Sequence, residues 1–302
     1  MNNALISAYL KMAQASARLG LHKFRLLRRL YHFSISQLRT RVPAEVVEIE
    51  GFKLFLNPAD SFIYMEILRN KIWEPAETRL VRETVKPGDV AVDIGANLGY
   101  FTLLFSTLVG PEGRVHAFEP EPGNFALLKR NVEANRRENV VLVNKAVSAK
   151  TGKERLYISE ENAGGHTIYS AGSRESVAVD AVRLDEYFAS ASSRVDFVKM
   201  DIQGAEGAAL EGMMPLLRQN GRVKILTEFW PEGLRKSGTG PERFLGLLAA
   251  GGFSLYDLKA GRDEMARTGV PDLLAAYGPG GGGAGKFTNL FCARENPGAG
   301  PA

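Results

Sequence analysis

The chain has 302 residues, of which 45% are hydrophobic and 24% charged, and its formal net charge is +4. This length and composition suit one globular α/β domain with an extension, and no run approaches the roughly 18 apolar residues of a membrane-spanning helix. The single cysteine, Cys292, excludes an intramolecular disulfide and a cysteine-based metal cluster. We therefore predict a cytoplasmic protein.

Residues 1–45 are predicted to form a basic helical extension. No acid precedes Glu45, whereas eight basic residues do, which is more than the net charge of +4 of the whole chain. Phe24, Leu27 and Tyr31 fall on one helical face with arginines beside them. Three uses of such a helix stay open: packing on the following domain, formation of a homodimer, and peripheral contact with an anionic membrane.

The basic residues of this extension are confined to one end of the chain, whereas a nucleic-acid binder carries them across its working face. No nucleic-acid partner is therefore predicted. A secretory signal is not predicted either, because no basic segment precedes an uninterrupted apolar core. An Arg-rich, acid-free composition is also typical of organellar transit peptides.

The next segment predicts a hairpin and two helices. Residues 46–56 alternate in hydrophobicity around Gly51, which is typical of a β-hairpin. Helices are expected over residues 63–69 and 77–85, separated by the phrase I-W-E-P. Its acid, Glu74, is either a helix N-terminal residue favoured by the helix dipole or a residue near a bound cofactor.

The central motif is V-A-V-D-I-G-A-N-L-G-Y-F-T over residues 90–102. An apolar run of this kind predicts a buried parallel strand, and the glycines that follow allow a sharp turn and close approach to a ligand before a helix over residues 100–109. A dinucleotide site requires G-x-G-x-x-G, but Ala96 replaces the middle glycine. Asp93 suits a cationic or hydroxyl-rich ligand better than a pyrophosphate, and S-adenosylmethionine is such a ligand.

A second short strand over residues 115–118 leads to Glu119 and Pro120. A carboxylate at that strand end can accept both ribose hydroxyls of an adenosyl group. A helix is expected over residues 122–135 and a third strand over residues 139–147. Near the end of this third strand, Asn144, Lys145 and Ala146 either contact the adenine edge or serve only to turn the loop.

The phrase P-G-D-V-x-V-D-I-G-A-N-x-G-Y over residues 87–100 resembles the FkbM-type family of class I S-adenosylmethionine-dependent methyltransferases. The resemblance extends over about residues 46–294 and implies a methyltransferase domain at residues 46–295, followed by a flexible tail at residues 296–302. It implies S-adenosyl-L-methionine as cofactor. The residues expected to bind it are Glu74, Asp93, Gly95, Ala96, Asn97, Gly99, Tyr100, Glu119, Pro120, Asn144, Lys145, Ala146 and Asp201.

Residues 152–180 depart from simple alternation of strands and helices. Strands are expected over residues 155–159 and 176–182, flanking a polar Gly-rich loop that contains His166. Such an insertion is typical of a lid or an acceptor-binding element. A short helix is expected to begin at residue 184.

The remaining strands are expected over residues 195–202, 223–230, 253–258 and 286–294, with helices ending near residue 217 and spanning residues 241–251. Residues 278–285 are a glycine-rich turn. The predicted fold is α/β: a doubly wound, Rossmann-like class I methyltransferase sheet, mostly parallel with an antiparallel closing strand, with β-hairpin insertions and the N-terminal helical extension.

Three residues are candidates for the reacting centre: Asp201, Glu206 and His166. Each has a simpler alternative, since Asp201 can cap the next helix, Glu206 can complement the helix dipole, and His166 can be a solvated loop residue. The family resembled here usually reads D-x-E-G-x-E, whereas this chain has Gln203 at the middle acid. That loss of charge weakens a shared cation between Asp201 and Glu228, and no metal is predicted.

The predicted function is in-line methyl transfer to a hydroxyl of a small-molecule or glycan acceptor, either a sugar or another natural product. A hydroxyl acceptor calls for a general base, because its proton must leave as the new bond forms. Two alternatives stay open. An NAD-dependent nucleotide-sugar oxidoreductase would require glycine in place of Ala96 and a Tyr-x-x-x-Lys pair. A non-catalytic, membrane-associated S-adenosylmethionine-binding module would use the basic helix.

Overall fold

The computed structural model describes residues 46–56, 63, 66–67, 70–158, 167, 175–189, 194–258, 265–278 and 286–294. The N-terminal extension at residues 1–45, most of the helix expected at residues 63–69, His166 and the tail at residues 296–302 lie outside the described residues. The domain boundaries and the roles of the extension therefore stay predictions.

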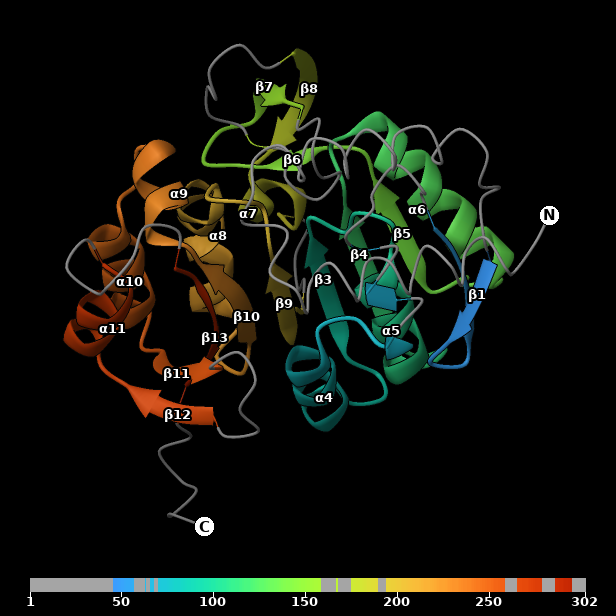
Figure 1. Cartoon of the computed structure of the whole chain (residues 1–302), viewed down its shortest axis with the longest axis horizontal. Coiled ribbons are helices and arrows are strands. Elements are labelled where there is room, and N and C mark those ends of the chain that lie inside the picture. The colour runs from blue at the N-terminus through green and yellow to red at the C-terminus, as the bar shows by residue number, and fades with distance from the viewer. Residues whose placement is uncertain are drawn as a thin grey trace, which may run out of the picture. The chain divides into compact units, whose positions relative to one another are not determined.

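An eight-stranded sheet forms the centre of the domain, in the order β12-β11-β13-β10-β9-β3-β4-β5 (Figure 1). Its five parallel strands are β3 (Val90–Ile94), β4 (Arg114–Phe118), β5 (Val140–Val143), β9 (Phe197–Met200) and β10 (Lys224–Phe229). The strand β13 (Thr288–Ala293) runs antiparallel between β10 and β11 (Ser254–Leu258), and β12 (Met265–Thr268) is the edge. The predicted mostly parallel sheet with an antiparallel closing strand is confirmed.

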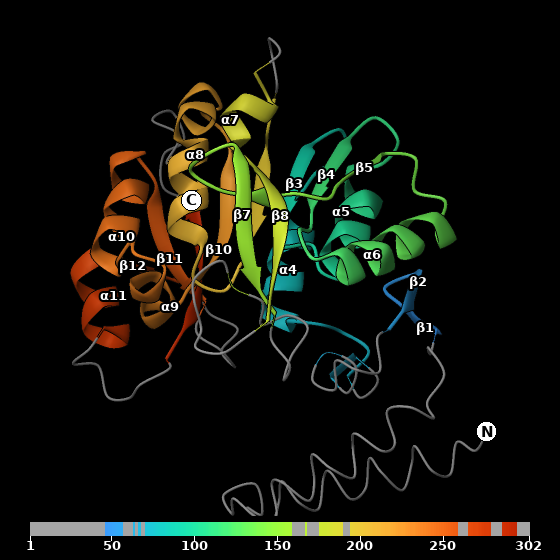
Figure 2. The same cartoon turned by 90° about the horizontal axis from the view of Figure 1, so that it is seen from above.

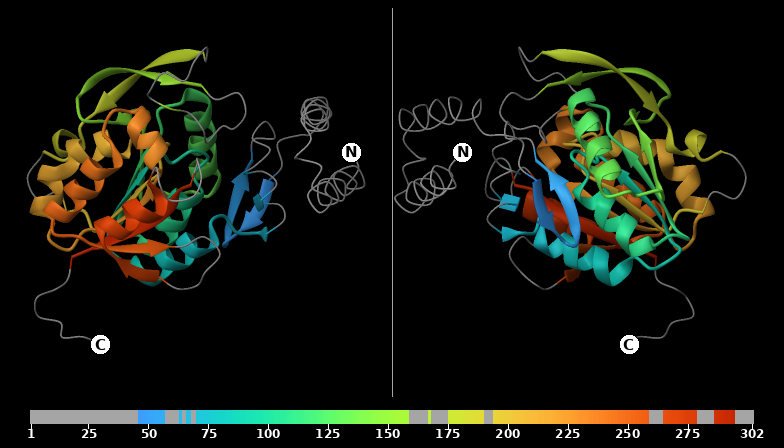
Figure 3. Two further views of the ribbon diagram at one scale, coloured as in Figure 1. Left: turned by 60° about the vertical axis from the view of Figure 1, so that its left-hand side comes forward. Right: turned by 90° about the vertical axis from the view of Figure 1, so that its right-hand side faces the viewer.

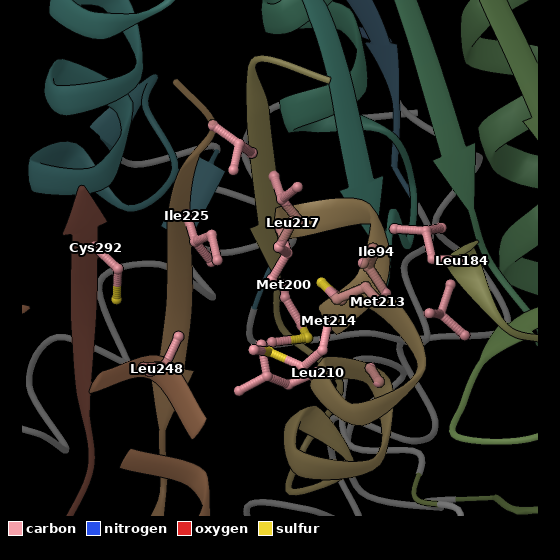
Figure 4. Packing of buried hydrophobic residues seen from close by; sticks show 14 of the residues in the cluster. Ile94, Leu184, Met200, Leu210, Met213, Met214, Leu217, Ile225, Leu248 and Cys292 are labelled. Atoms are coloured by element: carbon pink, nitrogen blue, oxygen red, sulfur yellow. The ribbon is translucent and has the colours of Figure 1, made fainter. Parts of the chain in front are cut away.

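Helices cover the sheet in two groups, as right-handed crossovers require when the strand order reverses beside β3. The helices α5 (Tyr100–Val109) and α6 (Pro122–Ala134) lie together on one side, and α8 (Glu206–Gln219) and α10 (Pro241–Ala250) lie together on the other (Figure 2). Against α8, strand residues pack into a core in which Met200 lies among Leu210, Met213 and Met214, and Ile225 belongs to the same buried cluster (Figure 4).

The shorter helices are α4 (Pro75–Thr84), α7 (Leu184–Tyr187), α9 (Pro231–Lys236) and α11 (Val270–Tyr277). Three elements were not predicted: α9, β12 and α11. Each is short, and α11 buries only Leu273, so its local sequence carries little of the periodicity on which a helix prediction depends. In the part of the chain that the structure describes, no helix combines the length and hydrophobicity needed to span a bilayer. The cytoplasmic location stays a prediction.

The predicted third strand over residues 139–147 is wrong as a single strand. It divides into β5 and β6 (Ala146–Val147), which belong to different sheets. The chain turns between them because Asn144 Nδ2 donates to the carbonyls of Glu119 (2.8 Å) and Pro120 (3.2 Å), while Lys145 N donates to Val143 O. This turn takes the chain out of the central sheet and past the end of β4.

The β6 strand forms a small sheet with β8 (Ser176–Val182) and β7 (Gly152–Tyr157). The β7 and β8 strands pair antiparallel, as predicted for the insertion, and Figure 3 shows them standing apart from the central sheet. Ala146, Leu156, Val179 and Ala181 form their own buried cluster. The insertion is therefore a separately packed element at the end of the sheet where β4 and β5 terminate.

The N-terminal hairpin of β1 (Val46–Ile49) and β2 (Phe52–Phe55) is docked onto α6 by two asparagines. Asn131 accepts from Phe55 N (2.7 Å) and donates to Phe55 O (3.1 Å), and Asn135 forms the same pair with Lys53 (2.8 and 2.6 Å). These side-chain amides satisfy the edge of β2 as a neighbouring strand would. Asn131 also donates to Leu98 O (2.7 Å), which connects the hairpin to the central Gly-rich loop.

Candidate active site

A cavity of about 500 Å³ opens at the carboxyl ends of β3, β4, β9 and β10. In open α/β sheets this edge is where ligands bind, and the volume lies in the usual range for a small-molecule site. Most of the predicted cofactor residues line it. They are Glu74, Asp93, Gly95, Ala96, Asn97, Tyr100, Glu119, Pro120, Lys145, Ala146 and Asp201.

The two glycines of the central motif are required by the backbone itself. Gly95 has φ +83°, and a Cβ on it would lie 2.1 Å from the carbonyl oxygen of Asp201. Gly99 has φ +95°, and a Cβ on it would lie 2.6 Å from Leu128 Cδ1 of α6. Gly95 therefore lets β3 and β9 end close together beneath the cavity, and Gly99 starts α5 tightly against α6. Gly99 supports the cavity from behind and does not line it.

Asp93 places a buried carboxylate at the end of β3. Its side chain is 1% exposed, and Thr102 Oγ1 donates to Asp93 Oδ2 at 2.6 Å. Burial raises the pKa of Asp93 above its ordinary value, and the Thr102 hydrogen bond and nearby Lys199 oppose that rise. A carboxylate buried in this way has a strong electrostatic preference for a cationic partner.

Glu119 follows β4 and is held by two backbone amides. Asn97 N donates to Oε2 at 2.8 Å, and Glu121 N donates to Oε1 at 2.9 Å. Each oxygen keeps a second lone pair for a ligand hydroxyl. Burial raises the pKa of Glu119 to about 7, and the two amides oppose the rise. Asn144 bonds the carbonyls of Glu119 and Pro120 and is not among the residues that line the cavity, so the structure favours the loop-turning alternative for Asn144.

Glu74 lies at the cavity wall, at the N-cap position of α4, with φ +45° and no capping hydrogen bond from its side chain. Its carboxylate points instead to Lys199, with 4.0 Å between Glu74 Oε2 and Lys199 Nζ. Burial raises the pKa of Glu74 to about 8, and Lys199 opposes the rise. Of the two alternatives for Glu74, the structure favours the position beside the cavity.

Lys199 is a charged residue of this site that sequence reasoning missed. It is paired with Asp93 in the register of β3 and β9, is 6% exposed, and its Nζ lies 3.7 Å from Asp201 Oδ2 and 4.5 Å from the Phe101 ring centroid. Burial alone would lower the pKa of Lys199, but the carboxylates of Glu74, Asp201 and Asp93 outweigh it and raise the pKa. The available signal was a lysine inside an otherwise apolar strand, V-D-F-V-K-M, which is rare without a buried partner.

Asp201, Gln203 and Glu228 line the cavity at the ends of β9 and β10. Glu119 lines it on the other side of β3, at the end of β4. Gln203 has φ +54°, and its Nε2 donates to Asp201 Oδ1 at 3.0 Å and to Glu228 Oε2 at 3.5 Å. Asp201 does not cap α8, because the N-cap residue is Ala205. The capping alternative for Asp201 is therefore wrong, and its carboxylate lines the cavity.

Glu206 is the first residue of α8 and is 0% exposed. Its Oε1 accepts from Ile202 N at 2.9 Å, and burial raises its pKa to about 7. Glu206 lies behind the cavity lining, against Asp201 and Glu228. The third candidate, His166, falls outside the described residues.

Aromatic side chains form the remaining wall, and sequence reasoning did not single them out. Trp73, Trp230 and Phe287 line the cavity, and Phe287 is 56% exposed at its position before β13. Trp230 packs on Gly233, where a Cβ would lie 2.2 Å from the indole ring. Such a wall suits the apolar face of an acceptor molecule.

Comparison with known proteins places these elements in a family. Residues 93–254 match the family model described as the methyltransferase FkbM domain. The chain is 26% identical over 190 residues to Methyltransferase 1 of Beauveria bassiana, covering 54% of this chain and 73% of the relative. It is 27% identical over 188 residues to the hexuronic acid methyltransferase AglP of Haloferax volcanii, covering 62% and 72%. Over 75 residues it is 41% identical to the 31-O-demethyl-FK506 methyltransferase FkbM of Streptomyces tacrolimicus, covering 25% and 26%.

Proposed function

The chain belongs to the FkbM family of methyltransferases and uses S-adenosylmethionine, and on that premise we propose that it methylates a hydroxyl oxygen of a sugar or another natural product. The observation that carries this proposal is the Asp201 carboxylate, which faces the same cavity as Asp93 and Glu119. A hydroxyl acceptor requires a group to take its proton, and a side-chain carboxylate that lines the cavity can do so.

The cofactor is proposed to lie across the ends of β3 and β4. Each Glu119 oxygen already accepts one backbone N–H, from Asn97 or Glu121, and uses its second lone pair to accept a hydrogen bond from a ribose hydroxyl. Asp93 neutralises positive charge on the amino-acid part of the cofactor, beside the backbone of Gly95 and Ala96. Lys145 and Ala146 line the cavity near the expected adenine position.

The acceptor is proposed to enter between Asp201 and the aromatic wall. Placing its oxygen in line with the methyl group, roughly 3–3.5 Å away, contributes on the order of 7–11 kcal/mol to lowering the barrier. Trp230 and Phe287 supply apolar area against which a ring can pack. The names of two relatives, a 31-O-demethyl-FK506 methyltransferase and a hexuronic acid methyltransferase, support an oxygen-bearing acceptor of this kind.

Family membership removes the oxidoreductase alternative. The site agrees, since Ala96 is 5% exposed and occupies the place where a dinucleotide fold requires glycine. The non-catalytic module is disfavoured because the carboxylates at the cofactor and acceptor ends are both present. Membrane contact or dimerisation through residues 1–45 stays a separate prediction.

The test uses S-adenosylmethionine labelled with ¹³C on its methyl group, a panel of monosaccharides, uronic acids and macrolide alcohols, and NMR of the products. We expect a methyl ether from at least one acceptor, and a loss of about 10²–10⁴-fold in kcat for Asp201→Asn, while the affinity for S-adenosylhomocysteine changes little. A product carrying its methyl group on nitrogen or carbon, or a methyl ester alone, would contradict the hydroxyl assignment. Unchanged kcat in Asp201→Asn would remove the base role.

A further inference from the structure

Three carboxylates from separate elements meet at the acceptor end of the cavity, where Asp201 and Glu228 line it and Glu206 lies behind them. Asp201 follows β9, Glu206 begins α8, and Glu228 lies within β10, and each offers an oxygen within 4.8 Å of the others. Glu206 and Glu228 are buried, with exposures of 0% and 9%, and the Asp201 side chain is 30% exposed. An acidic cluster on a surface needs no ligand, but two of these three groups are out of solvent.

Glu206 provides a second, independent observation. Its Oε1 accepts from Ile202 N, whereas its Oε2 is buried and has no hydrogen-bond partner among the residues that the structure describes. An unpartnered carboxylate oxygen in the interior is strongly disfavoured unless a cation or proton faces it. The side chain of Glu228 is little better satisfied in its hydrogen bonding, because among the described residues it accepts a single long hydrogen bond, from Gln203 Nε2 at 3.5 Å.

Positive charge from the described part of the chain does not balance this cluster. Among the described residues, the cation recorded within 4.0 Å of any of the three carboxylates is Lys199, at 3.7 Å from Asp201, and the same Nζ lies 4.0 Å from Glu74. Within the described residues, the Glu206–Glu228 end of the cluster is therefore short of cationic charge.

We propose that Asp201, Glu206 and Glu228 form a binding site for a hard divalent cation, with the side-chain carbonyl of Gln203 as a further ligand. Carboxylate and amide oxygens are the ligands that such cations prefer. Gln203 now donates its amide N–H₂ toward Asp201 and Glu228, and rotation of that amide by half a turn presents its carbonyl oxygen to the same space. This proposal departs from the prediction of no metal, which rested on the missing acid at residue 203.

The spacing of the oxygens indicates which cations fit. Oxygens on opposite sides of Ca²⁺ lie about 4.6–5.2 Å apart, since each is about 2.3–2.6 Å from the ion. The three carboxylate oxygens, all within 4.8 Å of one another, meet that limit without rearrangement. Mg²⁺, at about 2.0–2.1 Å from its ligands, places opposite oxygens near 4.2 Å. Oxygens within 4.8 Å of one another can therefore hold a hard divalent cation of either size, and Mn²⁺ serves as the probe.

The position of the site defines its use. Asp201, Gln203 and Glu228 all line the cavity, so a cation among them has open coordination positions toward the acceptor. A cation there would orient an acceptor hydroxyl and stabilise its alkoxide form. Binding of the ion does not depend on the identity of the acceptor, so failure of this proposal and failure of the hydroxyl-methylation proposal are distinguishable.

The experiment is a titration of the full chain with Mn²⁺, followed by electron paramagnetic resonance of the free ion, with and without S-adenosylhomocysteine. We expect one site with a submillimolar Kd in wild type. Glu228→Gln is expected to weaken binding at least about ten-fold, and Gln203→Glu to strengthen it, because ligand charge sets the affinity of such sites. The matched control is Glu232→Gln, which removes an acid that pairs with Lys236 on α9 and whose side chain is 38% exposed. This variant should leave the Kd within about two-fold of wild type.

Thermal melting without metal checks that each variant folds. If Glu228→Gln does not fold, Asp201→Asn replaces it, since that side chain is 30% exposed and tolerates the change more easily. Added Mn²⁺ should raise the melting temperature of wild type, Glu232→Gln and Gln203→Glu, but not of Glu228→Gln or Asp201→Asn. Absence of a Mn²⁺ site in wild type under both conditions would overturn the proposal, as would equal affinity in wild type and the ligand variant.

Discussion

The affinity for S-adenosylhomocysteine is expected to fall as the pH falls through 7, and Glu119 is the cause. Burial raises the pKa of this carboxyl to about 7. The ribose hydroxyls donate to the ionised form, so ligand binding favours the carboxylate and competes with protonation. Protonation of Glu119 in the ligand-free protein therefore weakens binding of S-adenosylhomocysteine at pH values below that pKa.

The size of the effect follows from the fraction of Glu119 that is ionised. With a pKa of about 7, that fraction falls from about nine-tenths at pH 8 to about one-thirtieth at pH 5.5, so Kd should rise about thirty-fold, or about 2 kcal/mol. Calorimetric titration at several pH values measures this directly. In Glu119→Gln the ligand should bind more weakly at pH 8, and the difference from wild type should shrink toward pH 5.5.

The comparison between the two proteins cancels titration of the ligand and of other acids in the cavity. Glu133→Gln, at a side chain 65% exposed on α6, is the matched control and should retain the wild-type pH profile. If the Kd for S-adenosylhomocysteine depended on pH equally in wild type and Glu119→Gln, Glu119 would not be the cause of the pH dependence. A wild-type affinity that stays constant between pH 5.5 and pH 8 would also refute the reasoning.

Three further results are expected. Because the folded-state pKa of Glu119 is raised from 4.5 to about 7, its contribution to stability is present below pH 4.5 and is lost as the pH rises through 7. Glu119→Gln should therefore stabilise the ligand-free protein at pH 8 by up to about 3 kcal/mol and by little at pH 4.5, as thermal melting would show; a stability difference independent of pH would contradict this. Gly95→Ala places a Cβ 2.1 Å from Asp201 O at φ +83° and should cost at least about 2 kcal/mol of unfolding free energy in urea titration, whereas Gly246→Ala in α10, with nothing within 4 Å, should be neutral or stabilising; equal effects would remove the close-approach argument. Lys199→Met leaves Glu74, Asp93 and Asp201 without their buried cation and should lower the free energy of unfolding by about 3–5 kcal/mol. Arg194→Met, whose side chain is 61% exposed, is the control and should lower it by under about 1 kcal/mol. A loss for Lys199→Met as small as that of the control would show that the buried pairs contribute little.

Much of the central fold was predictable because local signals and tertiary demands agree there. The strand at β3 and the helix α5 follow from an apolar run, two glycines and a second apolar run, and the bounds of α5 match the prediction. Gly95 and Gly99 both require φ values that glycine adopts freely. Asp93 and Glu119 could be placed at one edge of the sheet because parallel strands end together.

Lys199 could not be assigned a role from its surroundings in the sequence. Its partners, Glu74 and Asp201, reach it through the tertiary fold, and Asp93 lies beside it only through strand register. The two alternatives for Asn144 could not be separated for the same reason, because its hydrogen bonds go to carbonyls at Glu119 and Pro120 on another strand end. The sequence shows that such polar residues are present, while the fold decides which of them meet.

The most direct test of the account is a crystal structure of the full chain with S-adenosylhomocysteine. We predict that the ribose hydroxyls contact Glu119, that the amino group of the ligand lies near Asp93, and that the sulfur is directed at the space beside Asp201. A ligand bound in this cavity with its sulfur directed away from Asp201 would contradict the proposed reacting centre. A ligand bound elsewhere, or a Glu119 carboxylate without contact to it, would contradict the placement of the cofactor itself.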